Sequence, residues 1–501
     1  MQVSNQMRRW GGTFLLLALV IIISSGIYIT ITVEDQFAAL TAILLASILF
    51  PLYLSLRASR FELFEPIIFH SIFFTMIVIG WIERVYVTRT DISYEFVNRT
   101  FTEGFLLVGI VLLVLFVSIM AGYYTLGPAV AQWFENRGHT IQTILQTVSP
   151  SSGRAFRVVG GGYILIGLLS ILSAILLVFP PGEIFYLYTT TEPRSEVFAE
   201  NGVFILFSRA LYIGYLLWLS GAIMDGRTPS MIEFASAIPF AGAFLLLGGR
   251  GRAVSIIIIA IIFFYYSVIE DLFSLERGDF ARLTKHVPPG VLIVCLPIVG
   301  LVMAIGIVLL RVIRLSQSPI EALTSINPFS ILTAGVHTGI YDNFLGLVEI
   351  VPEQVGYFYG LFYARVPLNF VPRSIWPEKP VSTSGGLFRR IALPDASGGR
   401  PPGAMGEYYL NFGYPGIPLM GALYGILLYL TWQLINRDRV SVLSFVVFTL
   451  LLITIGKNGL VNNTLFPLVS DLVLLIPALF FLMGWQRISS PTVYSRHHDE
   501  S

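Results

Sequence analysis

The residues best placed to do chemistry in this sequence are cations at the edges of long apolar runs. Arg250 and Arg252 stand in a Gly-Gly-Arg-Gly-Arg run, Arg209 lies about two turns inside an apolar run, and Lys457 ends another. Ionisable groups at membrane depth are costly, so each is a candidate for function. Arginine binds phosphate in bidentate fashion and can stabilise a departing diphosphate without a metal. Structural roles are the alternatives to function. Arg209 could be an end residue that reaches the membrane interface, and Asp471, in the last apolar run, could pair with Lys457.

Three further residues are candidates for a general base. Glu407 lies in the run Gly-Glu-Tyr-Tyr-Leu-Asn-Phe-Gly at 406–413, just before an apolar run, and His337 and Asp342 lie in the segment 337–345. A carboxylate at a membrane interface can take a proton from an attacking hydroxyl. Equally, Glu407 could pair with an arginine and stabilise the start of a helix. A lone histidine such as His337 is more often a satisfied polar residue.

The sequence predicts neither a metal site nor another cofactor. It contains no Asp-x-Asp pair and no His-x-x-x-His spacing, and its single cysteine, Cys295, excludes an internal disulfide or a thiolate cage. Glu34 and Asp35 form an outward carboxylate pair, but such a pair more often marks the end of a span. We therefore expect chemistry carried by side chains alone.

The composition places these candidates in a membrane protein. Of 501 residues, 55% are apolar and 12% are charged, whereas soluble domains have roughly 45–50% and 25%. The mean hydropathy is +0.77. The near balance of 31 basic and 30 acidic residues excludes a nucleic-acid-binding protein of the usual basic kind.

Twelve apolar runs are long enough to cross a bilayer, which takes about 20 helical residues. The sequence thus predicts an all-α polytopic membrane protein with spans at 11–32, 36–56, 64–83, 103–124, 158–179, 203–223, 230–248, 253–269, 290–310, 412–434, 440–456 and 465–484. Fifteen lysines and arginines fall in the predicted inner connections and eight in the outer ones, before the long loop is counted. Basic residues favour the cytoplasmic side, so we expect both termini to be cytoplasmic.

These spans divide the chain into four segments. Residues 1–310 hold spans one to nine, 311–404 form one large outer loop, 405–485 hold spans ten to twelve, and 486–501 form a cytoplasmic tail. The loop has eleven aromatic residues and is rich in cations. Its prolines fix extended turns between short amphipathic pieces. We therefore expect a folded cap on the outer membrane face.

Two motifs about thirty residues apart resemble those of a known family. One is Val-Pro-Arg-Ser-Ile-Trp-Pro-Glu-Lys-Pro at 371–380, and the other is the Gly-Glu-Tyr run at 406–413 with its Asn-Phe-Gly end. The Gly-Gly-Arg-Gly-Arg run at 248–252 adds a third likeness. Together they resemble the bacterial oligosaccharide repeat-unit polymerases, that is, the Wzy-type O-antigen and exopolysaccharide polymerases. The motifs cover roughly residues 245–435, and the rest of the chain is similar in hydropathy only.

The resemblance implies a metal-independent glycosyltransferase with a GT-C-like membrane fold in the bacterial inner membrane, its large loop between spans nine and ten being periplasmic. The growing glycan would pass from one undecaprenyl diphosphate to the sugar of an incoming undecaprenyl-diphosphate-linked repeat unit, within the lipid membrane. A chain-length regulator (polysaccharide co-polymerase) is an implied partner.

The resemblance also implies residue roles. Glu407, His337 or Asp342 would activate the acceptor hydroxyl. By the same resemblance, Arg250, Arg252, Arg373 and Lys379 would hold diphosphates. From their own positions in the sequence we add to the substrate-binding candidates Arg365, Arg209, Lys457, Tyr408, Asn411 and Trp376. Related O-antigen ligases have a His-Asn pair before a Leu and a Glu, and the run from Asp342 to Leu345 with Glu349 is similar, with Asp in place of His. That departure favours a polymerase over a ligase and leaves the base open.

Two rival classes have different sequence signatures. A transporter of lipid-linked glycans places polar groups and broken helices near the bilayer midplane. In this chain the predicted spans have little charge at mid-depth, apart from His70 in span three. A structural assembly protein would use the large loop as a docking surface.

Overall fold

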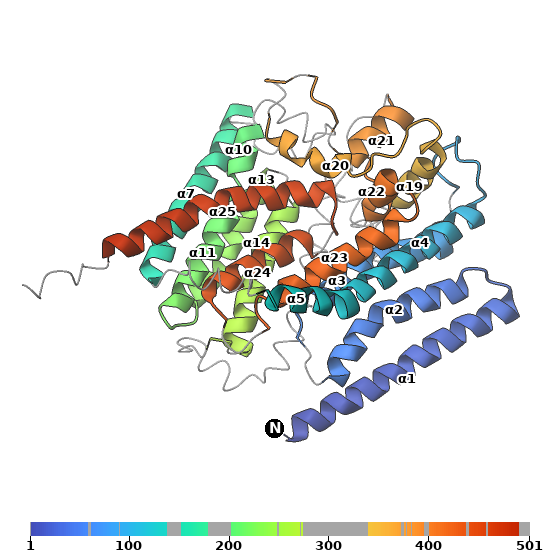
Figure 1. Ribbon diagram of the computed structural model, residues 1–501, viewed down its shortest axis with the longest axis horizontal. Helices are drawn as coiled ribbons and strands as arrows, with labels where there is room; N and C mark the ends of the chain where they lie inside the picture. The colour runs from blue at the N-terminus through green and yellow to red at the C-terminus, as the bar shows by residue number, and fades with distance from the viewer. Residues whose placement is uncertain are drawn as a thin grey trace, which may run out of the picture.

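The computed structural model describes most of the chain, and every regular element in that part is a helix (Figure 1). The described residues are 2–58, 62–89, 91–137, 152–178, 202–247, 250–270, 272–273, 339–371, 375–376, 378–381, 383–394, 400–436, 440–456 and 459–489.

The N-terminal part consists of long apolar helices, two of which continue into π-helical turns. Thr100 and Glu103 form a capping box that begins α4, and Pro66 stands at the first turn of α3, where proline is well tolerated. The helices are α1 (Gln2–Val33), α2 (Ala38–Arg57), α3 (Pro66–Ile82) with η1 (Glu83–Thr88), and α4 (Phe101–Ala121) with η2 (Gly122–Leu126) and α5 (Gly127–Glu135).

A second group of helices packs closely through glycine. A Cβ added to Gly160 of α7 would lie 2.7 Å from the amide nitrogen of Trp218, and one added to Gly214 of α11 would lie 2.5 Å from that of Ile164. Small residues permit this approach between membrane helices. The group comprises α7 (Gly153–Val178), α10 (Gly202–Phe207), α11 (Ala210–Met224), α12 (Met231–Ala235), α13 (Ala237–Leu246), α14 (Arg250–Phe264) and η3 (Tyr265–Ile269).

The described part of the predicted loop is folded into short helices, which lie together along the upper edge of Figure 1 with the start of the C-terminal helices. They are α19 (Gly339–Ile350), α20 (Leu361–Ala364), the 3-10 helix η4 (Val366–Phe370) and α21 (Ser384–Ala392). The chain continues through α22 (Gly403–Phe412), α23 (Gly416–Trp432), α24 (Val442–Ile455) and α25 (Asn462–Ser489). α22 crosses the predicted boundary at 404/405, and α25 extends four residues into the predicted tail.

The helices support a polytopic membrane protein, with fewer clear spans than predicted. Within the described residues, eight helices are long and apolar enough to cross a membrane, or nine if α22 and α23, which meet at 118°, form one broken span. The helices at 231–246 and 442–455 are apolar but shorter. Predicted span nine, 290–310, lies outside the described residues.

The short helices of the loop belong to the same apolar core as the N-terminal helices. Tyr341 and Phe344 of α19 are fully buried in a cluster with Trp81 and Phe105, which lie on α3 and α4. A second core joins α7, α11, α13, α14 and α24. In Figure 1, α25 runs across the molecule from the loop helices to α7, and it contacts both η4 and α7.

Candidate functional site

A cavity of about 400 Å³ lies between the N-terminal helices and the loop. One wall comes from α3 and α4, through residues such as Phe74, Ile77 and Leu115, and is apolar except for His70. The opposite wall comes from α21, α22 and the segment that leads into α25. The polar residues that line the cavity are His70, Ser384, Glu407, Tyr408, Tyr424 and Thr464.

Glu407 is the carboxylate on the cavity wall within the described residues. It is 1% exposed, and the Ser384 hydroxyl donates a hydrogen bond of 2.9 Å to its Oε2 atom. Ser384 is the first residue of α21, whose N-cap is Thr383. The α21 and α22 helices thus hold a serine and a carboxylate together at the cavity.

The rest of the 406–413 motif holds the surrounding backbone. The Tyr408 hydroxyl accepts a hydrogen bond of 3.0 Å from the Leu460 amide, which fixes the connection into α25. The Asn411 Oδ1 atom accepts one of 3.0 Å from the Gly360 amide, and Asn411 is fully buried. Gly413 has φ 67° and ψ −162°, a conformation available essentially to glycine alone. Tyr408 and Asn411, which the sequence suggested for substrate binding, therefore have structural partners.

Tyr363 of α20 is a neighbour of Glu407 that sequence reasoning missed. Its hydroxyl is buried and has no hydrogen-bond partner among the described residues. Burial, with a smaller effect from the Glu407 carboxylate, raises the pKa of Tyr363 far above its usual range, so the hydroxyl remains a donor. Its loop position among eleven aromatic residues gave no signal that would single it out.

His70, the polar residue predicted at mid-depth, lines the cavity from α3. Its Nδ1 atom is 3.1 Å from the Gly456 carbonyl and 3.1 Å from the Tyr424 hydroxyl. Because Tyr424 donates its one proton to the Ile455 carbonyl, both neighbours act as acceptors, which assigns the imidazole proton to Nδ1. The Nε2 atom is then an acceptor, buried and without a partner among the described residues.

Asp342 has a different environment from Glu407. The Arg84 guanidinium lies 3.2 Å from its carboxylate, both side chains are 6% exposed, and Ser93 donates a further hydrogen bond of 2.6 Å. The neighbouring Asn343 accepts a hydrogen bond from Tyr94. The conspicuous Asp-Asn pair thus fastens α19 to the segment 84–94. Asp342 does not line the cavity described above.

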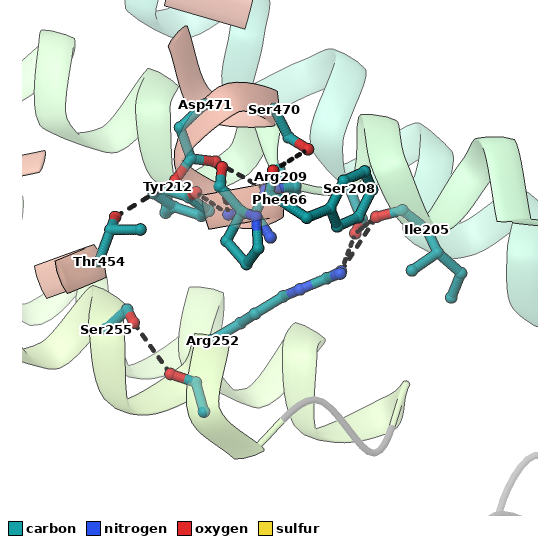
Figure 2. A network of polar contacts seen from close by, with 12 residues as sticks. Ile205, Ser208, Arg209, Tyr212, Arg252, Ser255, Thr454, Phe466, Ser470 and Asp471 are labelled. Carbon is teal, nitrogen blue, oxygen red and sulfur yellow. Dashed lines mark hydrogen bonds and ion pairs between the residues drawn. The ribbon is translucent and has the colours of Figure 1, made fainter. Parts of the chain in front are cut away.

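Figure 2 shows a second polar group, centred on Arg209 and Asp471. The Arg209 guanidinium lies 2.6 Å from the Asp471 carboxylate, and it also donates to the Tyr212 hydroxyl and the Pro467 carbonyl. Thr454 donates to the other carboxylate oxygen at 3.4 Å. Arg209 is therefore a buried ion-pair partner of Asp471, not an end residue that reaches the interface, while the expected contact between Asp471 and Lys457 lies outside the described residues.

Arg252 lies beside this group, as Figure 2 also shows. It donates hydrogen bonds to the Ile205 carbonyl at 3.0 Å and the Ser208 hydroxyl at 2.7 Å. Ile205 lies in the last turn of α10, where carbonyls lose their helical partners, and Ser208 lies in the break between α10 and α11. Arg252 thus stabilises the break, and its side chain is partly exposed.

Two of the loop cations predicted to bind substrate lie within the described residues, and both bind backbone carbonyls of the loop. Arg365 lies over the Phe358 and Phe362 rings and donates to the Val381 carbonyl at 3.2 Å. Lys379 donates to the Val371 carbonyl at 2.9 Å, and Trp376 is 41% exposed. His337, Arg373 and Lys457, with the side chain of Arg250, lie outside the described residues.

The two polar groups are connected through α25. Thr464, in its first turn, lines the cavity, while Pro467 and Asp471 bind Arg209 one and two turns further on. The cavity group therefore unites Glu407, Ser384 and His70, with Tyr363 beside Glu407, and the arginine group lies along the next turns of the same helix. Sequence reasoning identified Glu407, Arg209 and Arg252 but not this shared helix.

Within the described residues, no three His, Cys, Asp or Glu side chains are grouped so as to hold a metal ion. Comparison with known proteins yields no matching protein-family model, curated protein or solved structure.

Proposed function

We propose that this protein is a helical membrane enzyme whose substrate has both an apolar and a polar part. A cavity with an aliphatic and aromatic wall inside the helices, and a carboxylate with hydroxyls on the other wall, suits such a molecule. Within that class, we propose a Wzy-type oligosaccharide repeat-unit polymerase at the periplasmic face of the bacterial inner membrane. The resemblance of the 371–380 and 406–413 motifs to those of Wzy-type polymerases supports this assignment.

The observation that carries the proposal is the position of Glu407. Its carboxylate lines the cavity and accepts a hydrogen bond from Ser384, within a motif whose Tyr408 and Asn411 hold the surrounding backbone. A buried carboxylate so placed suits a general base. Asp342, held by Arg84, suits a structural role.

In the proposed reaction, the acceptor hydroxyl oxygen bonds to the anomeric carbon of the growing glycan. The bond between that carbon and the diphosphate oxygen breaks, and Glu407 takes the hydroxyl proton. The undecaprenyl diphosphate leaves as an anion. Arg252, with Arg250, Arg373 and Lys457, would balance the negative charge of the diphosphate. Arg209 would contribute indirectly, by keeping α25 in position.

The test is to incubate purified protein with undecaprenyl-diphosphate repeat units from the source organism and to measure glycan ladders. Glu407→Gln should lower the rate by about 10²–10⁴-fold, the range for loss of a general base. The matched control is Glu135→Gln, at an exposed helix end, which should retain full activity. A folded Glu407→Gln variant with the wild-type rate would sink the assignment. Transfer to lipid A core in place of a ladder would indicate a ligase.

The bent pair α22 and α23 favours one second candidate, a transporter of lipid-linked glycans. Transporters use broken helices with polar residues beside a substrate site. Here the 118° bend joins a helix that carries Glu407, and His70 lies across the cavity. Movement of lipid-linked units across proteoliposomes, with no glycosyl transfer by the same preparation, would favour this candidate.

A further inference from the structure

The turn at 358–361 presents an aromatic ring from an unfavourable backbone conformation. Tyr359 and Gly360 have φ values of 47° and 85°, and the Leu361 amide donates to the Phe358 carbonyl at 2.9 Å. Two successive positive φ values at the centre of such a turn normally select Asn, Asp or Gly. Tyr359 is the less favourable choice there, and 77% of it is exposed. Its packing within the protein does not account for a tyrosine at this position.

The turn is fastened to the end of α22. The Phe358 amide donates to the Leu410 carbonyl at 3.1 Å, and the Tyr359 amide donates to the Asn411 carbonyl at 2.8 Å. The last carbonyls of a helix lack helical partners, so these bonds satisfy groups that would otherwise need water. With the Asn411 side chain holding Gly360, the Tyr359 ring projects from a fixed backbone.

Other tyrosines continue from Tyr359 as a row. The Tyr357 ring centroid is 6.3 Å from that of Tyr359 and 6.0 Å from that of Tyr409, and Tyr409 is 4.9 Å from Tyr414. Tyr409 is buried, whereas Tyr414 is 43% exposed.

A partly exposed ion pair lies beside the end of this row. Arg99 Nε is 2.8 Å from Glu349 Oε1, with the side chains 37% and 19% exposed, and both residues interact electrostatically with Tyr414. We call Tyr357, Tyr359 and Tyr414, with Arg99 and Glu349, the tyrosine platform.

We propose that the tyrosine platform binds the saccharide part of the substrate, an inference that rests on the proposed function. The apolar face of a sugar ring packs on an aromatic face, and a phenol, a guanidinium and a carboxylate hydrogen-bond its hydroxyls. Glu407 and Tyr409 are two residues apart on α22, about 200° around the helix. The platform therefore holds sugars on the other side of α22 from the reacting hydroxyl.

The test uses a probe without lipid or diphosphate, the oligosaccharide released by mild acid from the organism's lipid-linked pool. Its binding to the purified full-length protein is measured by calorimetry and saturation-transfer NMR. Tyr359→Asn fits the turn better, so this variant should be at least as stable as wild type yet bind roughly tenfold more weakly. Tyr359→Phe should retain most of the binding. The control is Tyr28→Asn, at a 67% exposed tyrosine of α1, which should leave binding unchanged.

Equal binding by wild type and Tyr359→Asn would overturn the platform, and so would the absence of binding to wild type at millimolar probe. The outcomes distinguish failure of the platform from failure of the polymerase assignment. If Tyr359-dependent binding persists while no ladder forms, the saccharide site stands and the proposed reaction falls. If a Glu407-dependent ladder forms with unchanged Tyr359→Asn binding, only the platform falls.

Discussion

Asp342, on a helix of the predicted loop, and Glu407, on the helix that ends that loop, are both buried carboxylates, but they have different neighbours. Asp342 has a guanidinium partner and a serine donor, so its charge is compensated inside the protein. Glu407 accepts from Ser384 at the wall of a cavity. A buried charge needs a partner for stability, and a reactive one needs in addition the access to a ligand that the cavity gives Glu407.

Replacing Asp342 with Asn should therefore lower the stability of the protein below that of wild type. Removing one partner of a buried ion pair typically costs about 3–5 kcal/mol, because Arg84 is left buried without its counter-charge. Thermal unfolding of the detergent-solubilised variants measures the difference. The double variant Arg84→Met with Asp342→Leu should regain much of the loss. Wild-type stability for Asp342→Asn would contradict the structural role.

Residue types in the sequence indicated the candidate groups but not their partners. Arg209 and Asp471 could each be recognised as costly in a membrane, yet they are 262 positions apart and nothing local links them. The same holds for Glu407 and Ser384, 23 positions apart on separate helices. Pairing depends on tertiary packing, which the periodicity of one helix does not reveal.

At the scale of elements, α22 depends on the turn that covers its end. Gly413 lies where this turn meets the helix, and a Cβ there would lie 3.1 Å from the Tyr357 ring. The positive φ of Gly413 adds strain for any other residue. The Asn-Phe-Gly end of the motif thus has a local explanation in the docking of residues 357–361.

Gly413→Ala should accordingly destabilise the protein by about 1–3 kcal/mol and loosen the loop. Limited proteolysis and thermal unfolding measure both effects. Gly356→Ala is the matched control in the same segment, since a Cβ there meets nothing within 4 Å. Equal protease resistance of the two variants would argue against the docking role of Gly413.

Apolar runs predicted the helices well, since eleven of the twelve predicted spans coincide with described helices. The breaks were less predictable. The interruption at Ser208 and Arg209 carries no proline or glycine, and the Ile205 carbonyl there accepts hydrogen bonds from the Ser208 hydroxyl and from Arg252 of another helix. The π-helical turns η1 to η3 likewise have no signal in hydropathy.

At the scale of the whole molecule, the sequence bias of basic residues predicts an outer loop and cytoplasmic termini. In a Cys295→Ser background, Glu353→Cys should react with a membrane-impermeant maleimide in spheroplasts. Glu135→Cys should react only after permeabilisation. Both positions are exposed in the structure, so access depends on the side of the membrane. The reverse pattern would invert the orientation and move Glu407 to the cytoplasmic face.

The contact between Arg84 and Asp342 also has a consequence for how the protein is made. The two residues are 258 positions apart, so the arginine is synthesised long before its counter-charge. At 5–20 residues per second, the delay is roughly 10–50 s. During that interval α3 and α4 lack the loop helices that complete their apolar core. Insertion machinery or lipid headgroups must shelter that charge until the last third of the chain arrives.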